Sequence, residues 1–139
     1  MFDRLNIEYD SEHRLAICRV NGSFDGTFAR QLLSFLLAVE EDPSQHPFNR
    51  LLDLSGVTEV HLTADEVSQF AKARRSATDH LPHFRTAIVA PSPLANGTAR
   101  IYEMLMQSSK IQVSVFWEPN DAAVWLGIPG EVITGKTKS

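Results

Sequence analysis

Short apolar runs alternate along this chain with segments whose apolar residues recur at helical spacing. The run RLLDL (residues 50–54) is too short and too apolar for a surface element, and RTAIVA (85–90) and IQVSVFW (111–117) follow as a second central strand and a last strand. Runs of this kind are typical of strands that are covered on both faces. Strands that alternate with helices imply parallel crossover units, so the pattern restricts the chain to an α/β fold.

The first part of the chain adds a hairpin to this pattern. Leu5, Ile7 and Tyr9 alternate with polar residues, DSEH makes a turn, and RLAICRV follows as a second strand. We therefore expect a hairpin over residues 4–20 and the order ββαβαβαβα. The predicted fold is a single mixed β-sheet, an N-terminal hairpin plus parallel βαβ units, covered by helices.

Local signals mark where the helices begin and end. Residues 27–41 form the first helical segment, with Phe28, Leu32, Phe35, Leu36 and Val39 at helical spacing. Thr63-Ala-Asp-Glu66 has the spacing of a capping box, and the helix that it opens runs to Pro82. A third helix is expected over residues 98–109, with Ile101, Leu105 and Ser108 facing inward, and a short one ends at Gly127.

Length and composition indicate one domain. The 139 residues are 43% apolar, and no linker or repeat divides them, so we expect an α/β domain over residues 1–127 and a flexible tail over 128–139. The net charge of −4 provides no basic stripe for nucleic acid. The acidic N-terminus is unlike a signal peptide, and no apolar run approaches the ~18 residues of a membrane span, so we expect a cytoplasmic protein.

Three stretches carry a resemblance to a known family. They are the pair Asp53-Leu54, the stretch AIVAPSPLANGTARIYE (residues 87–103) and the stretch VFWEPNDAAVWLG (115–127). With the order of elements, they resemble the STAS domain, the fold of the anti-sigma-factor antagonists, and more closely the bacterial SpoIIAA-like group. This second resemblance spans nearly the whole chain. It implies a STAS-type fold and a regulatory or binding role.

The chain departs from the antagonists at their phosphorylation site. In those proteins an Asp-Ser-Ser-Gly-like turn carries the serine that the partner kinase phosphorylates. This sequence has HLTA, residues 61–64, in that place. Thr63 is the predicted N-cap of a helix, where its hydroxyl accepts a backbone N–H. The antagonist mechanism is therefore not carried over.

Asp53 stands at the end of a predicted buried strand, just before Ser55 and Gly56. Aspartate in such a place commonly accepts backbone N–H groups of the following turn, so we expect Asp53 and Ser55 to hold that turn. The alternative is a phosphoacceptor, which needs further acids nearby to hold magnesium. The stretch RVNGSF at the end of the earlier strand offers no such acids.

The segment APSPLANGTAR is the best candidate for a ligand site, because it joins a central strand to a helix N-terminus, which favours anions. Ser92, Asn96, Gly97, Thr98 and Arg100 are the candidate binding residues. Alternatively, Ser92 or Asn96 caps the helix and Pro93 starts it, which requires no ligand. The glycine-rich phosphate motifs do not occur.

No sequence motif indicates catalysis, a cofactor or a metal. GxSxG is absent, and His80 and His83 are separated by the helix breaker Pro82. We expect a non-enzymatic regulatory or binding module that acts through protein contacts or a small ligand. The alternative is a small enzyme or lipid-carrier-like protein with a pocket near residues 91–100.

The third predicted helix has apolar residues beyond its inward stripe. Ala99, Tyr102 and Met106 lie on a neighbouring face, and a helix that is apolar on more than one face often meets a partner. We expect this face to form a homodimer. A wide stripe that packs within the chain is the alternative.

Overall fold

The computed structural model describes residues 4–41 and 48–134. Its strands are β1 (Leu5–Asp10), β2 (Leu15–Asp25), β3 (Asn49–His61), β4 (Phe84–Val89) and β5 (Ile111–Phe116). Its helices are α1 (Gly26–Glu40), α2 (Ala64–Thr78), α3 (Pro93–Leu105), α4 (Pro119–Leu126) and α5 (Gly130–Thr134).

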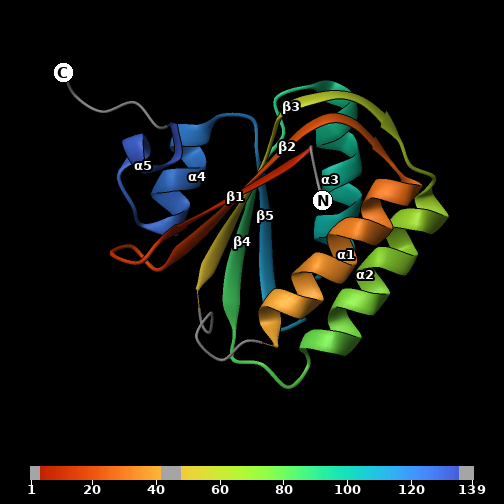
Figure 1. The fold of residues 1–139 in the computed structure, drawn as a ribbon, viewed down its shortest axis with the longest axis horizontal. Coiled ribbons are helices and arrows are strands. Elements are labelled where there is room, and N and C mark those ends of the chain that lie inside the picture. Colours follow the sequence, from red (N-terminus) through yellow and green to blue (C-terminus); the bar gives the residue numbers. More distant parts are fainter. Residues whose placement is uncertain (1–3, 42–47, 135–139) are drawn as a thin grey trace.

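The five strands form one mixed sheet in the order β1-β2-β3-β4-β5. β1 and β2 form an antiparallel hairpin, and the pairs from β2 to β5 are parallel. The predicted fold class is therefore confirmed. Parallel crossovers are almost always right-handed, so three successive crossovers along the sheet in one direction place their helices on the same face. Figure 1 shows α1, α2 and α3 on that face, and α4 and α5 on the other.

The alternation of side chains along the strands supplies both faces with a core. Val20, Ile88 and Val115 face α1 and α3, whereas Leu51 and Ala87 face α4 and α5. The core under α1 and α3 includes the buried rings of Phe24 and Phe28, whereas the buried side chains of the core under α4 and α5 are aliphatic. Burial of this apolar surface is the main force that holds the helices on the sheet.

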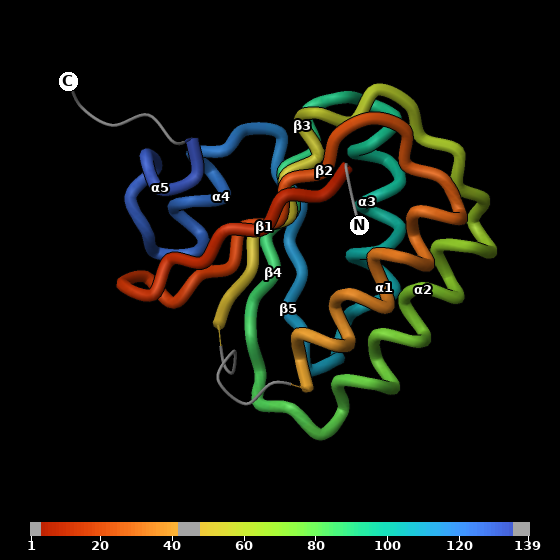
Figure 2. The backbone as a smooth tube through the Cα atoms, viewed as in Figure 1, coloured from red at the N-terminus to blue at the C-terminus, as the bar shows by residue number. Residues whose placement is uncertain are grey.

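β3 is longer than the run that the sequence indicated. The predicted strand ended near residue 54, but β2 and β3 stay paired through two irregularities of register as far as Asp25 and His61. Gly56 fits there because a Cβ atom would lie 2.0 Å from the Asn21 Oδ1 and 3.0 Å from the Val20 carbonyl oxygen. The paired ends curl over the starts of α1 and α2 (Figure 2).

Two of the local signals in the sequence correctly predicted where a helix begins or ends. Thr63 accepts the Glu66 N–H while Glu66 accepts the Thr63 N–H, which is the predicted capping box. Gly127 ends α4 in a left-handed conformation with φ of 74°, as expected. The chain then continues into α5, whose Ile133 is buried against the sheet. The folded part thus extends past the expected boundary at residue 127, while residues 135–139 of the predicted tail lie outside the described residues.

Candidate functional site

α3 begins earlier than predicted and uses its own polar groups at its start. Ser92 is the N-cap and accepts the Ala95 N–H, and Pro93 is the first helical residue. The predicted helix start at residue 98 is therefore wrong, and the alternative in which Ser92 caps the helix and Pro93 starts it is confirmed, because these are preferred residue types for a cap and a first turn. The buried Asn96 donates to the Ala90 carbonyl at 3.0 Å, which ties this first turn to the end of β4.

The other three candidate binding residues, Gly97, Thr98 and Arg100, differ from one another in their surroundings. The Nε of Arg100 donates to Asn96 Oδ1 at 3.2 Å, and the guanidinium pairs with Glu103 at 3.5 Å. Gly97 is exposed. Thr98 alone of the five candidates lines the apolar pocket described next. Anion binding at the start of α3 remains a prediction.

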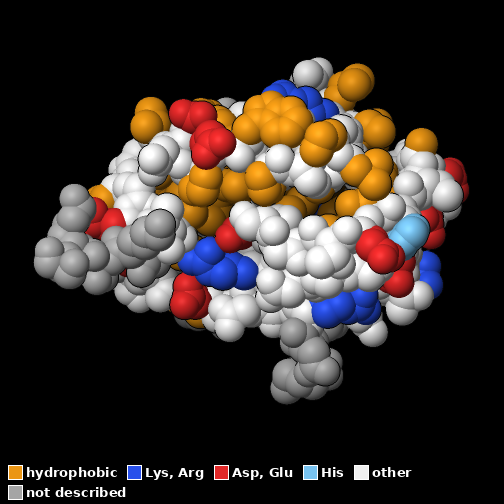
Figure 3. All heavy atoms as spheres, turned by 90° about the horizontal axis from the view of Figure 1, so that it is seen from above, with side chains coloured by type: hydrophobic (Ala, Val, Ile, Leu, Met, Phe, Trp, Pro, Cys, Tyr) orange, Lys and Arg blue, Asp and Glu red, His pale blue; other side chains and the backbone are white. Residues whose placement is uncertain are grey.

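An apolar pocket lies between the sheet and the three helices α1, α2 and α3. Its free volume is about 100 Å³. The apolar lining includes Leu32, Leu36, Leu54, Val60, Phe70 and Ile88. Figure 3 looks onto the upper end of the molecule in Figure 1 and shows apolar side chains gathered across that face, with charged groups around them. The pocket therefore offers apolar contacts.

Charged side chains lie at one end of this pocket. Glu40, Arg50 and Arg74 are only 4%, 4% and 2% exposed, although they come from α1, β3 and α2. Arg74 Nη1 donates to Glu40 Oε1 at 2.5 Å, and Arg50 donates to the other oxygen of the same carboxylate. The Arg50 guanidinium also stacks 4.8 Å from the centre of the Phe84 ring. Both arginines line the pocket, so we call Glu40, Arg50 and Arg74 the buried charge cluster.

The buried charge cluster is not balanced within the described residues. Two guanidinium groups share one carboxylate, which leaves an excess of one positive charge. Among these residues, Arg50 Nε, Arg74 Nε and Thr86 Oγ1 are buried without a hydrogen-bond partner. Buried polar groups normally have partners, and an uncompensated buried charge is costly. The imbalance marks this end of the pocket as a place where an acceptor would be stabilised.

The neighbouring Tyr102 is a neutral hydrogen-bonding group. Burial raises the pKa of the Tyr102 phenol, and the nearby arginines offset only part of this effect. Burial by itself would lower the pKa of Arg74, but the Tyr102 and Glu40 oxygens raise it. Arg74 is therefore charged at all physiological pH values, and the Tyr102 hydroxyl keeps its proton.

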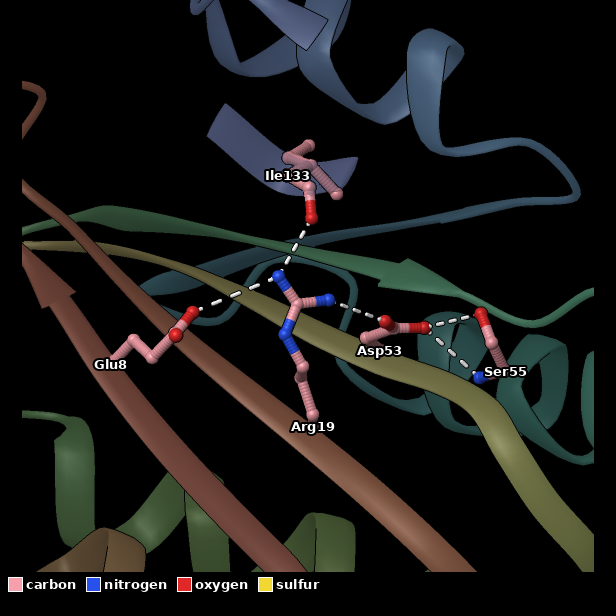
Figure 4. A network of polar contacts seen from close by, with 5 residues as sticks. All are labelled: Glu8, Arg19, Asp53, Ser55 and Ile133. Atoms are coloured by element: carbon pink, nitrogen blue, oxygen red, sulfur yellow. Dashed lines mark hydrogen bonds and ion pairs between the residues drawn. The ribbon is translucent and has the colours of Figure 1, made fainter. Parts of the chain in front are cut away.

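Asp53 lies on the other face of the sheet, away from the pocket. Its Oδ1 accepts the Ser55 N–H at 2.9 Å and the Ser55 hydroxyl at 2.5 Å. Its Oδ2 accepts from Arg19 Nη1 at 2.8 Å, and Arg19 Nη2 donates to the Ile133 carbonyl at 2.7 Å. Figure 4 shows this network connecting β2, β3 and α5. The arrangement holds backbone in place, although the segment after Asp53 is a continuing strand and not a turn.

The expected partner-binding face of α3 points into the chain. Ala99 and Met106 are only 6% and 1% exposed, and the ring of Tyr102 packs edge-on against Phe70 with centroids 5.6 Å apart. Ile101 and Leu105, which were expected to face inward, are exposed instead. The inward stripe is therefore one residue out of phase with the prediction, because the helix begins at Pro93 and packs through Ala95 and Ala99.

Sequence reasoning missed the buried charge cluster. Arg74 did stand in the apolar stripe of the second helix, and Arg50 opened an apolar run, which are the two signals that could have indicated it. Within residues 4–41 and 48–134, the His, Cys, Asp and Glu side chains form no group of three that could hold a metal ion. None of the helices in these segments has the length and apolar character that crossing a bilayer requires.

The fold has a counterpart among solved structures. No family model matches the chain. No curated protein matches it either. A crystal structure of an uncharacterised protein of the DUF3478 family with a SpoIIAA-like fold, from Shewanella loihica PV-4, is similar with a TM-score of 0.56. The two sequences are 15% identical, and the match covers 88% of this chain and 91% of the other. The chain therefore has the SpoIIAA-like fold.

Proposed function

We propose that this protein is a non-enzymatic binding module whose apolar pocket holds a small apolar or amphipathic ligand. The pocket itself carries the proposal. Protein interiors are close-packed and contain few voids larger than one water, which needs about 10–15 Å³. The space of about 100 Å³ between the sheet and α1 to α3 is several times larger. Pockets that are mostly apolar with a few converging polar groups are typical ligand sites.

The residues that line the pocket also favour binding over catalysis. Its polar lining consists of arginines, threonines, Tyr102, Cys18 and Glu66. Burial raises the pKa of the Cys18 thiol to about 11, so it is not a nucleophile at neutral pH. Glu66 is engaged in the capping box of α2. The pocket thus supplies contacts and charge, and it offers no activated nucleophile paired with a base.

The test is the binding of a neutral amphiphile, 1-octanol, measured by isothermal titration and by thermal denaturation. A ligand that binds only the folded state raises the melting temperature by mass action. We expect saturable binding by the wild-type protein. Ala99→Leu adds carbon atoms inside the pocket and should weaken 1-octanol binding at least tenfold.

Ala38→Leu is the matched control, because it makes the same change of residue type at an exposed position of α1. It should bind 1-octanol like the wild type. The proposal is wrong if the wild-type protein binds no 1-octanol up to the solubility limit, or if Ala99→Leu and Ala38→Leu bind it equally.

A second candidate function is regulation through protein contacts, including a homodimer. Exposed apolar side chains on α3 favour it, namely Leu94, Ile101, Met104 and Leu105. Exposed apolar side chains that gather on one helix commonly meet another protein. This candidate and ligand binding are compatible, since none of these four exposed side chains lines the pocket.

A further inference from the structure

We infer that the ligand of this pocket is an amphiphile with one negative charge, whose acidic head group lies against Arg50 and Arg74. This inference rests on the proposed ligand-binding function and specifies the chemistry of the ligand. Both arginines line the pocket and are more than nine-tenths buried, and within the described residues they share the single carboxylate of Glu40. One further negative charge in the pocket neutralises the buried charge cluster.

Unused hydrogen-bonding capacity points to the same place. Arg50 Nε and Arg74 Nε have no acceptor within the described residues, and Thr86 Oγ1, on the strand beside Arg50, has no partner there. Tyr102 keeps its phenolic proton and lines the same pocket. Hydrogen bonds between such donors and an ionised acceptor are stronger than bonds between neutral groups. Water alone would not remove the charge excess.

The two arginines lie at one end of the pocket, which sets the orientation of an acidic ligand. Arg50 is near the start of β3 and Arg74 is near the end of α2. Val57, Val60 and Leu62 line the other end of the pocket, beside the start of α2, where the lining also includes Glu66, whose carboxylate accepts the Thr63 N–H. A chain-like ligand therefore places its head group between the ends of α1 and α2 and its apolar tail toward the curled ends of β2 and β3.

A carboxylate fits the charge balance better than other head groups. A singly charged carboxylate brings the buried charge cluster to zero, whereas a phosphate monoester near neutral pH overcompensates it. An ammonium group adds a second uncompensated positive charge, which a buried site strongly disfavours. An alcohol makes hydrogen bonds but leaves the excess charge in place.

The experiment compares four ligands of equal chain length, namely octanoate, 1-octanol, octyl phosphate and octylamine, by isothermal titration at constant ionic strength. We expect octanoate to bind the wild-type protein at least about tenfold tighter than 1-octanol, since hydrogen bonds to charged groups are the stronger class. Octyl phosphate should bind less tightly than octanoate, and octylamine should not bind. Equal affinity for octanoate and 1-octanol would overturn the inference while leaving the proposed function intact. If no ligand binds, the proposed function fails as well.

The role of the arginines is tested with Arg74→Met, which keeps an unbranched apolar stem and removes the guanidinium and its charge. Glu40 still pairs with Arg50 in this variant, so the buried charge cluster becomes neutral. The preference for octanoate over 1-octanol should fall to about threefold or less. Arg30→Met, at an exposed position of α1, is the matched control and should keep the wild-type preference. An unchanged preference in folded Arg74→Met contradicts the inference.

A second measurement on the wild-type protein does not depend on any variant. Nuclear Overhauser contacts should join the methylene group beside the octanoate carboxylate to Tyr102, and the terminal methyl group to Val60 or Leu62. The reverse orientation, or contacts outside the pocket, would contradict the assigned head-group site.

Discussion

At the scale of single residues, Cys18 shows how burial controls reactivity. Its side chain is buried beside the pocket, and burial raises the pKa of the thiol to about 11, although the nearby Arg50 and Arg74 act in the opposite direction. The thiolate is the reactive form, so the folded protein should react only slowly with Ellman's reagent at neutral pH. Labelling should become fast in denaturing urea. Rapid labelling of the folded protein would show that Cys18 is accessible and ionised.

The contribution of the Asp10–His13 pair to the stability of the hairpin turn should depend on pH. His13 Nδ1 lies 2.9 Å from Asp10 Oδ2, and this hydrogen bond raises the pKa of His13 and lowers the pKa of Asp10. The contribution of His13 to stability is fully present below its unfolded value of 6.5 and is lost as pH rises through the raised pKa. The contribution of Asp10 is present above 3.8 and is lost as pH falls through the lowered pKa. The pair therefore stabilises the turn between the two shifted values.

A nuclear magnetic resonance titration measures this directly. The pKa of His13 should lie above 6.5 in the wild-type protein. Asp10→Asn should bring it back toward that value, because the amide cannot stabilise the imidazolium as a carboxylate does. A pKa of His13 that Asp10→Asn leaves unchanged would assign the shift to another group.

At the scale of secondary structure, the capping box of α2 should make a measurable contribution to stability. Thr63 and Glu66 exchange hydrogen bonds of 3.0 Å and 2.9 Å at the helix N-terminus. Thr63→Ala should lower the free energy of unfolding by about 1 kcal/mol, with a range of roughly 0.5–2. Thr63→Ser keeps the hydroxyl and should remain close to the wild type in urea denaturation. Equal losses in the two variants would mean that the hydroxyl is not the cause.

The attachment of α5 to the sheet should depend on Arg19. Its guanidinium connects Asp53 with the Ile133 carbonyl (Figure 4). Arg19→Met leaves the half-buried Asp53 carboxylate without this partner, so we expect a loss of about 1.5–3 kcal/mol and faster amide exchange in α5. Glu8→Gln is the control, because its ion pair with Arg19 at 3.7 Å is exposed and should contribute less than about 1 kcal/mol. Unchanged exchange in α5 after Arg19→Met would contradict this role.

At the scale of the whole molecule, association remains a prediction, now with different residues. Ala99 and Met106 are buried in the chain, whereas Leu94 and Met104 of α3 are 61% and 64% exposed. A twofold contact covers such a surface with a single patch, and it is the commonest arrangement of soluble oligomers. We expect the wild-type protein to sediment as a dimer.

Two substitutions separate this surface from other exposed apolar positions. Leu94→Glu combined with Met104→Lys should yield a folded monomer. Val124→Lys changes an apolar position on α4 that is 80% exposed, and it should leave the dimer intact. A wild-type protein that sediments as a monomer at tens of micromolar would remove the dimer from consideration.

Most of the fold followed from patterns that are local in the sequence. Strand alternation, the spacing of apolar residues in α1, the capping box at Thr63 and the stop at Gly127 each depend on residues within a few positions of one another. Backbone geometry and hydrogen bonding act over the same short range, so these elements could be predicted. The parallel order of the strands then followed from the lengths and handedness of the connections.

The pocket and its charges were decided by tertiary structure. Glu40, Arg50 and Arg74 lie on three different elements, and nothing local in the sequence indicates that two arginines share one carboxylate. The face of α3 that is buried was also ambiguous, because apolar residues occur on several sides of this helix and only packing against the sheet selects one. The length of β3 depended on its pairing with β2. The packing of α5 against the sheet depended on the hydrogen bond from Arg19 and on burial of Ile133. Local sequence determines which elements form, whereas the combination of burial and charge at a site depends on residues that only the folded chain brings together.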